Sequence, residues 1–214
     1  MLRTNKVNES MTVATDRRMT LQEFLTYDDG TDRRYELVDG VLIEMGAEST
    51  INTQIAVFLI SLFIQLGLPI VEIGVKQLIE VVSQFASARD PDLIIHTANS
   101  ATAIDGRKEA CLFLGEPNPR VVIEIVSPGA KSSKNQKRDY EQKPKEYANR
   151  GISEMWQIDP SREWVRVGTL NRGEYQFQTF VGEDTIVSPS FPALNLTASQ
   201  ILSAGRTSLV RKLK

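Results

Sequence analysis

A single carboxylate stands inside an apolar segment of this chain. Glu124 lies in the run Val121-Val122-Ile123-Glu124-Ile125-Val126, whose β-branched residues are typical of a buried strand. An ionised carboxylate is costly to bury unless it is paired, protonated or bound to a metal. A second acidic segment, Asp90-Pro91-Asp92, precedes the apolar run Leu93-Ile94-Ile95. We therefore expect the carboxyl groups of Asp92 and Glu124 to lie close enough to share a hard divalent cation.

Glu36 and Lys143 complete a candidate set of four with these two acids. The four residues are far apart in the sequence, so only a folded sheet brings them together. Two of them also have a structural explanation. Glu36 is able to pair with Arg33 or Arg34 in a hairpin, and Asp92 is able to cap its strand through a turn around the preceding proline. Glu124 has no comparable structural explanation and favours function.

The composition is that of a globular protein with one core. The chain has 214 residues, of which 41% are hydrophobic and 24% charged. We expect a tail over residues 1–19, a single domain over residues 20–204 and a basic tail over residues 205–214. Its apolar runs are too short to span a bilayer, and the first 19 residues lack the apolar centre of a signal peptide, which predicts a cytoplasmic protein.

Cysteine and histidine contribute little to the expected chemistry. The one cysteine excludes an internal disulfide, and the one histidine leaves too few ligands for a zinc finger. We interpret Cys111 as ordinary packing and His96 as a surface residue at the end of a strand. Catalysis would then rest on carboxylates and lysine.

The charge distribution is more informative than the net charge of −2. The segment between residues 131 and 145 is locally basic, which fits either a solvated helix face or a surface that contacts DNA phosphates without reading sequence. The residues proposed for the DNA surface are Lys131, Lys134, Lys137 and Arg138.

The order of predicted elements indicates a mixed α+β fold, because helices and strands do not alternate strictly. Thr20 and Glu23 form a capping-box pattern, and Asp39-Gly40 is a hairpin signal between strands 35–38 and 41–45. A core helix is expected over 49–66 and a basic helix ending near 150. Strands are expected at 70–82, 92–95, 120–126, 155–158, 164–167, 175–179 and 185–187, with a mostly polar linker over 97–116.

The arrangement resembles the PD-(D/E)XK nuclease superfamily and, within it, the Uma-two family of restriction-endonuclease-like proteins. The likeness runs from about Thr20 to Leu202, and five motifs in the right order carry it. These motifs are Arg34 to Gly40 (RYELVDG), Arg89 to Leu93 (RDPDL), Val121 to Pro128 (VVIEIVSP), Asp139 to Gly151 (DYEQKPKEYANRG) and Glu154 to Pro160 (EMWQIDP). The resemblance implies a restriction-endonuclease-like core, with a mixed central sheet flanked by helices.

What the resemblance implies about chemistry is a metal-dependent endonuclease that hydrolyses DNA phosphodiester bonds. Asp92 and Glu124 would bind Mg²⁺, or Mn²⁺, with the Ile125 carbonyl as a further ligand, and Glu36 would complete the site. The lysine that usually lies two residues after the second acid is replaced by Val126, and Lys143 on the following helix matches instead.

Helical geometry supports Lys143 over Lys145 as the inward-facing lysine. At about 100° per residue, Lys143 shares a face with Tyr140 and Tyr147, whereas Lys145 points about 200° away. Pro144 cannot donate to the Tyr140 carbonyl, so the helix is either kinked there or begins with Pro144 in its first turn.

Two other functions remain open from the sequence. One is a non-catalytic nucleic-acid-binding or interaction module on a nuclease-like fold, and the other is a metal-dependent hydrolase of a different phosphate ester. We also expect a homodimer, because cutting both strands of a duplex from one active site per chain generally requires two chains. Lys143→Ala is expected to abolish turnover while keeping dimerisation and Mg²⁺ binding.

Overall fold

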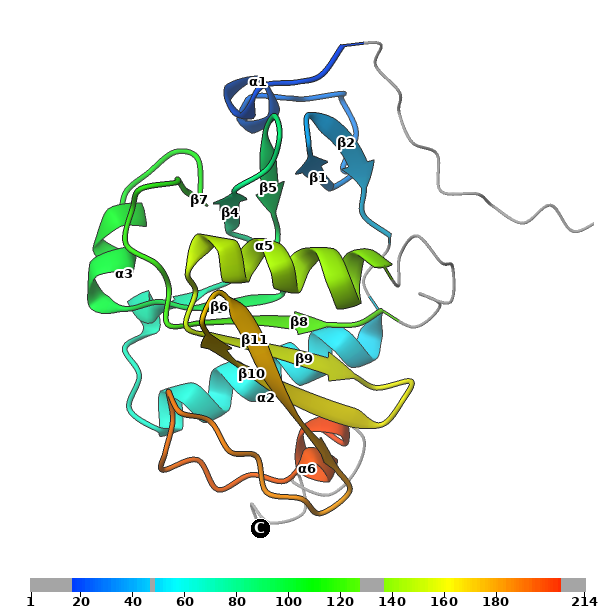
Figure 1. The fold of residues 1–214 in the computed structure, drawn as a ribbon, viewed down its shortest axis with the longest axis vertical. Coiled ribbons are helices and arrows are strands. Elements are labelled where there is room, and N and C mark those ends of the chain that lie inside the picture. The colour runs from blue at the N-terminus through cyan, green and yellow to red at the C-terminus, as the bar shows by residue number, and fades with distance from the viewer. Residues whose placement is uncertain (1–16, 47–48, 128–136, 205–214) are drawn as a thin grey trace, which may run out of the picture.

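The computed structural model describes residues 17–46, 49–127 and 137–204, which form a mixed α+β fold with five α-helices and two mixed sheets (Figure 1). The expected fold class is confirmed. The helices are α1 (Leu21–Leu25), α2 (Thr50–Gln65), α3 (Ala98–Ile104), α5 (Lys143–Arg150) and α6 (Ala198–Leu202), with a 3₁₀ turn η1 (Ile70–Glu72) and a π-helical turn η2 (Arg138–Gln142). The strands are β1 (Tyr35–Val38), β2 (Val41–Glu44), β3 (Ile73–Gly74), β4 (Leu78–Val81), β5 (Ser87–Arg89), β6 (Leu93–Ile95), β7 (Cys111–Leu112), β8 (Val121–Ile125), β9 (Glu154–Asp159), β10 (Trp164–Asn171) and β11 (Glu174–Val181).

The strands divide between two sheets. The smaller sheet has the order β2-β1-β5-β4-β7, and the larger has the order β11-β10-β9-β8-β6-β3. In the larger sheet β8 runs parallel to β9 and antiparallel to β6. The long β10–β11 hairpin extends this sheet at one edge, as expected for the chain from Trp164 onward.

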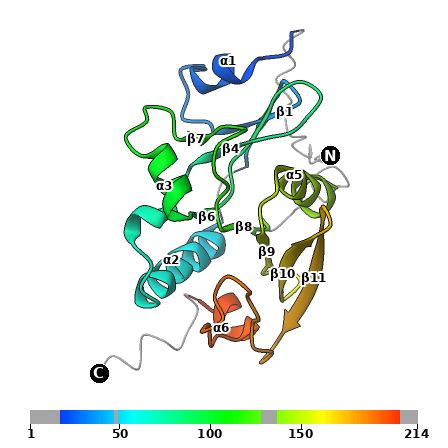
Figure 2. The same cartoon turned by 60° about the vertical axis from the view of Figure 1, so that its left-hand side comes forward.

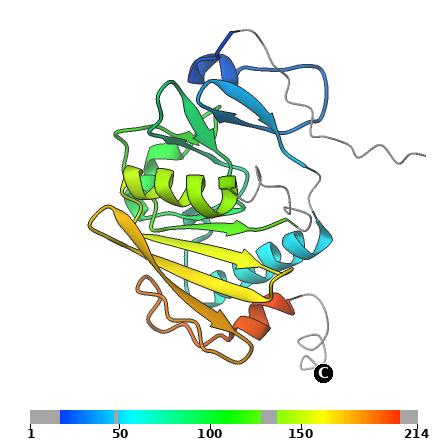
Figure 3. The ribbon, with the colours of Figure 1, turned by 45° about the vertical axis from the view of Figure 1, so that its right-hand side comes forward.

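Helices α2 and α5 cover opposite faces of the larger sheet (Figures 2 and 3). Successive side chains of a strand point to opposite faces, and the two hydrophobic clusters follow this rule along β8. Ile123 packs in the cluster that contains Leu59 of α2, whereas Val122 packs in the cluster that contains Tyr147 of α5. Glu124 is therefore on the α5 face.

The strongest local sequence signals form as predicted. Asp39 and Gly40 have φ angles of 50° and 79°, the left-handed pair that a tight hairpin turn requires, between β1 and β2. Thr20 and Glu23 make the reciprocal capping box of α1. Ser49 caps α2, whose buried positions repeat at helical spacing.

The prediction of one continuous strand over residues 70–82 is wrong, because only residues 73–74 and 78–81 form strands within it. This segment contains η1, the short β3 and then β4, and these two strands belong to different sheets. Lys76 between them has a left-handed φ of 54°, so the chain turns there without glycine. The expected linker over 97–116 contains α3, which Thr97 and Ser100 cap reciprocally, and β7.

The expectation that His96 is a surface residue is wrong. Its side chain is fully buried, with Nδ1 3.1 Å from Ser100 Oγ and Nε2 2.7 Å from Gln77 Oε1. Burial lowers the pKa of His96 to about 4. Cys111 is buried as expected, and burial raises its pKa to about 12, so the thiol is inert at neutral pH.

The buried histidine predicts a specific pH dependence of stability. Because the folded-state pKa is below the unfolded value near 6.5, the unfolded chain binds the proton first as the pH falls. His96 therefore removes stability between about pH 6.5 and 4, by an amount on the order of 3 kcal/mol. We expect His96→Gln, which does not titrate, to lose correspondingly less stability between pH 7 and 4.5 in urea unfolding. Parallel pH profiles for the two proteins would contradict this.

The predicted division into a domain and two tails can be compared with the structure only in part, because residues 1–16 and 205–214 lie outside the described residues. The single domain over residues 20–204 stays a prediction. Within the described parts of the chain, none of the helices combines the length and apolar content needed to cross a membrane.

Candidate functional site

The segment that carries Lys143 changes its helical geometry just before Pro144. In η2 the Lys143 N–H donates to the Arg138 carbonyl, a bond that spans five residues as in a π-helix. Helix α5 then begins at Lys143 with Pro144 in its first turn, where a missing N–H costs least. Gly151 ends the helix with a φ of 88°. Pro144 is thus accommodated in the first turn of α5, and the π-helical turn η2 directly precedes that helix.

Lys143 lies between two buried carboxylates. Its Nζ atom is 2.7 Å from Glu124 Oε2 and 3.1 Å from Glu36 Oε1, and its side chain is 6% exposed. Lys145 is exposed, as helical spacing predicts. Burial alone would lower the pKa of Lys143, but Glu124 and Glu36 raise it above its ordinary value. The lysine is therefore protonated throughout the neutral range.

The two carboxylates around Lys143 are tuned in opposite directions. Burial raises the pKa of Glu124 above its ordinary value, although the Lys143 charge opposes the rise. Burial would also raise the pKa of Glu36, but Lys143 and then Arg89 lower it to about 2. Tyr147 donates its hydroxyl to Glu124 Oε1 at 2.6 Å. Glu36 is thus a permanent anion, whereas Glu124 is held closer to its protonated form.

Glu36 is not paired with its sequence neighbours. Arg89 NH1 is 3.1 Å from Glu36 Oε2, and the same guanidinium donates to both oxygens of Glu146 at 2.6 and 2.8 Å. Arg33 pairs instead with Glu44, and Arg34 with Asp90. The hairpin ion pair considered for Glu36 is therefore wrong. Glu36 is on β1 of the smaller sheet, and Glu124 is on β8 of the larger. Because both contact Lys143 of α5, the lysine links the two sheets at the site.

Asp92 is positioned beside Glu124 by the pairing of β6 with β8. Leu93 is opposite Ile123, and one further step of this register puts Asp92 opposite Glu124. Directly opposed residues have Cβ atoms about 4.5 to 5.5 Å apart on the same face of the sheet. Asp92 Oδ2 also accepts the Ile125 N–H at 2.6 Å. That the two carboxyl groups share a cation stays a prediction, which this register favours.

Asn52 of α2 is a site neighbour that the sequence interpretation missed. Its Nδ2 donates to the Ile125 carbonyl at 2.9 Å, so one of the two lone pairs of that oxygen is already used. A signal was present, because Asn52 is a polar residue at the buried helical positions that Ile55 and Leu59 continue. Glu146 and the hydroxyl of Tyr147 were missed as well, because their partners are remote in sequence. Arg89 could be expected to pair with either a site carboxylate or a DNA phosphate, and the structure shows the contact with Glu36.

The donor set fits a hard cation held by two carboxylates. No cluster of three or more His, Cys, Asp or Glu side chains within the described residues is arranged to hold a metal. Mg²⁺, however, is commonly bound by one or two carboxylates, with water and substrate phosphate as its other ligands. Asp92 and Glu124 supply such oxygens. Two buried oxygens near them, Asn52 Oδ1 and Asp90 Oδ1, have no hydrogen-bond partner, so the neighbourhood has acceptor capacity left over.

The predicted basic surface is only partly described. Lys131 and Lys134 lie outside the described residues. Lys137 is exposed, and Arg138 pairs with Asp139 at 3.1 Å while its charge helps to lower the pKa of Glu36. Arg138 is therefore close enough to the acidic site for its charge to act on Glu36, and Lys137 directly precedes it in the chain.

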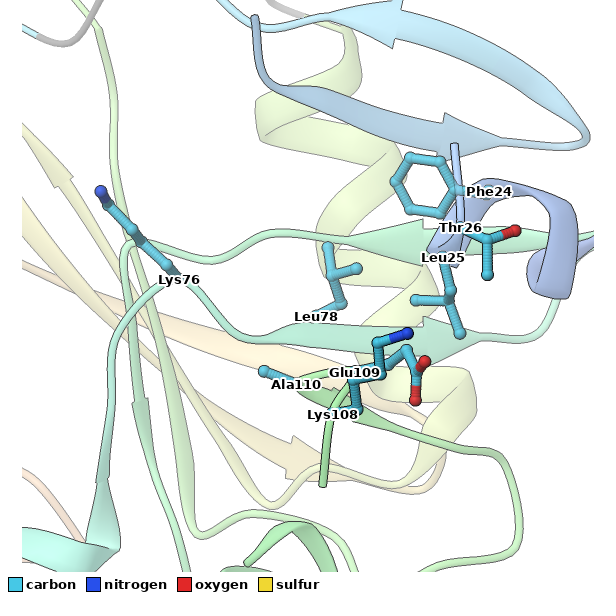
Figure 4. A pocket seen from close by; sticks show the side chains of 8 residues that line it. All are labelled: Phe24, Leu25, Thr26, Lys76, Leu78, Lys108, Glu109 and Ala110. Carbon is cyan, nitrogen blue, oxygen red and sulfur yellow. The ribbon is translucent and has the colours of Figure 1, made fainter. Parts of the chain in front are cut away.

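A cavity of about 400 Å³ is separate from this site. Figure 4 shows its lining, which comes from α1, the start of β4 and the segment before β7. None of the four candidate residues lines it. The cavity is therefore not part of the acidic site.

Comparisons with known proteins bear on the family and on the fold. Residues 21–199 match a family model described as "Uma2: Putative restriction endonuclease". The fold is similar to a crystal structure described as "a putative nuclease belonging to DUF820" from Anabaena variabilis, with a TM-score of 0.64 and 20% sequence identity. That match covers 86% of this chain and 98% of the other. No curated protein matches the chain.

Proposed function

Since the chain belongs to the Uma2 family of restriction-endonuclease-like proteins, we propose that it is a divalent-metal-dependent endonuclease that hydrolyses DNA phosphodiester bonds. The observation that carries the proposal is the placement of Lys143 Nζ within 3.1 Å of both Glu36 and Glu124. Residues from β1, β8 and α5 meet there, although they are far apart in the sequence.

Asp92 and Glu124 would hold the cation, for which we propose Mg²⁺, with the second lone pair of the Ile125 carbonyl as an added ligand. When bound, such a cation lowers the pKa of a water molecule and neutralises charge on the phosphate. The proposed DNA contacts are the basic residues Lys131, Lys134, Lys137 and Arg138. They would bind the backbone without reading its sequence.

Lys143 would act through its charge and its hydrogen bonds. Its raised pKa keeps it protonated at neutral pH, so it cannot accept a proton from water. It is able to donate to the attacking water or to a phosphate oxygen, where negative charge develops. Glu36, ionised at all physiological pH values, would hold the ammonium group in place.

The proposal is tested by cleavage of supercoiled plasmid during a titration with Mg²⁺ and, separately, with Mn²⁺. We expect nicked and linear products that depend on metal concentration and vanish in the presence of a chelator. Retention of the plasmid on the protein without cutting would contradict nuclease activity, and hydrolysis of a small phosphate ester with intact plasmid would indicate a different substrate.

A non-catalytic nucleic-acid-binding module is the second candidate, and one observation favours it. Both oxygens of Glu124 already accept hydrogen bonds, one from Lys143 and one from Tyr147. A structural network of this kind would satisfy the buried charge without a metal. The plasmid assay separates the two candidates, because a binding module retards DNA at every metal concentration and leaves it uncut.

The same proposal includes a homodimer in the cytoplasm. A duplex cut on both strands by one active site per chain requires two chains, and a symmetric pair matches the two-fold symmetry of the duplex backbone. The expected result is a dimer in sizing chromatography. A monomer would leave the chemistry of the site in place and would favour nicking of one strand.

A further inference from the structure

Two arginines flank a pair of aromatic rings beside the acidic site, a group that we call the arginine–aromatic stack and that runs in the order Arg162, Tyr140, Trp164 and Arg166. The Arg166 guanidinium lies 4.3 Å from the centroid of the Trp164 ring, and the Arg162 guanidinium lies 4.7 Å from that of Tyr140. The two rings are themselves 5.9 Å apart. Stacking of this kind fixes the plane of a guanidinium while leaving its N–H edge available.

Arg166 keeps its charge uncompensated. No carboxylate of the described residues pairs with it, and its Nε atom donates to the Thr179 hydroxyl at 3.1 Å. Arg162, by contrast, is 3.3 Å from Asp159 Oδ2. Arg166 is thus a cation held in one orientation by an aromatic ring and a hydroxyl, with its remaining N–H groups unused. A fixed fork of this kind is suited to phosphate oxygens.

The register of the larger sheet places Arg166 in one row with the proposed metal ligands. Glu124 is opposite Gln157 on β9, and Gln157 is opposite Arg166 on β10. Residues in register project from the same face, and neighbouring strands are about 4.8 Å apart, so Arg166 is roughly 10 Å from Glu124 across the sheet. Between them Gln157 donates to the Asp139 carbonyl of η2 at 2.8 Å. Figure 3 shows the yellow-green helical segment that contains α5 above these strands.

We propose that Arg166, oriented by Trp164, binds a backbone phosphate of DNA near the one that reacts. The inference rests on the proposed nuclease function and extends its DNA surface from the helical segment around Arg138 to strand β10. Binding of the backbone by a stacked arginine is independent of base sequence. It would fix the position of the duplex relative to the acidic row.

The test measures binding of a fluorescent 20-base-pair duplex between 50 and 200 mM salt by anisotropy, with cleavage prevented by Glu124→Gln. Adding Arg166→Ala is expected to reduce the slope of log affinity against log salt by about 0.9, the value for one phosphate contact. At 0.1 M salt this corresponds to a loss of affinity on the order of tenfold. Arg172→Ala, at an exposed residue in the turn between β10 and β11, is the control and should keep both slope and affinity.

Arg166→Gln serves as a second variant, because it retains a donor for Thr179 while removing the charge. It should lose the same slope with unchanged thermal unfolding. If both Arg166 variants keep the slope and affinity of the Glu124→Gln parent, this inference is overturned and the nuclease proposal stands. Absence of DNA binding by the Glu124→Gln parent would overturn both.

Discussion

Replacement of Lys143 by methionine is expected to lower the free energy of unfolding by about 3 to 5 kcal/mol at pH 7, the usual cost of breaking a buried ion pair from one side. The ammonium group is the shared cation of two carboxylates that are each at least nine-tenths buried, and its loss leaves Glu36 and Glu124 facing each other. Denaturant unfolding monitored by circular dichroism measures the effect. Lys145→Met, two residues along the same helix and exposed, should change stability by less than about 0.5 kcal/mol.

A rescue variant separates charge from packing in this prediction. Adding Glu124→Gln to Lys143→Met removes one of the two carboxylates that have lost the ammonium group, while Glu36 keeps its contact with Arg89, and should restore part of the lost stability. The difference between wild type and Lys143→Met should also narrow in acid. Glu36 has a folded pKa near 2, below its ordinary value of 4.5, so its stabilising contribution is complete above about pH 4.5 and lost as the pH falls toward 2. Equal stability of the two proteins at pH 7 would show that the ammonium group is not the counterion of this pair.

This cost changes how a loss of activity at Lys143 must be interpreted. The helical pattern around Lys143 predicts an inward-facing lysine, and on that basis Lys143→Ala removes turnover alone. The contacts with Glu36 and Glu124 predict a loss of stability as well. Cleavage by such variants is therefore informative only beside an unfolding curve, at a temperature where the variant remains folded.

The parts of the fold that the sequence predicts correctly are those decided by local chemistry. The turn at Asp39-Gly40 and the caps at Thr20 and Ser49 each depend on a few neighbouring residues, so their signals are complete within a short window. The boundary between β3 and β4 could not be predicted in this way. The chain turns there at Lys76, which has a left-handed backbone conformation that the residue type does not signal. Strand β5 carries Arg89, a charged residue that becomes favourable in a strand only once Glu36 and Glu146 surround it.

The same distinction between local and remote contacts applies to the candidate site. The cost of burying a lone acid pointed to Glu124 from its apolar flanks alone, and helical spacing pointed to the inward face of Lys143. The network around them could not be predicted, since Arg89 and Asn52 reach the site from other elements, and the partner of the Tyr147 hydroxyl is on β8 although Tyr147 shares a helix with Lys143. The prediction that His96 is exposed was wrong for a related reason, because its two ring nitrogens are covered by contacts with Ser100 and Gln77.

Glu124→Gln is expected to abolish metal-dependent cleavage while leaving the fold within about 1 kcal/mol of wild-type stability. A cation that has lost one of its two carboxylates forfeits several kcal/mol of transition-state stabilisation, a rate loss on the order of a thousandfold. The fold tolerates the change, because glutamine keeps one acceptor oxygen in the same volume and removes a charge that burial disfavours. Plasmid cleavage and thermal unfolding of the same preparation measure the two effects. Glu141→Gln, an exposed acid on η2, is the control and should retain activity.

The metal dependence of unfolding decides what Glu124 does. A ligand present at 100 times its dissociation constant stabilises the folded state by about 2.7 kcal/mol, so wild-type protein in saturating Mg²⁺ should unfold at a higher temperature than in chelator. Glu124→Gln should lose most of that increment, whereas Glu141→Gln should keep it. If Mg²⁺ adds no stability to the wild type and Glu124→Gln is severely destabilised, Glu124 is a structural partner of Lys143 and Tyr147. The non-catalytic binding module would then account better for the buried network than the nuclease.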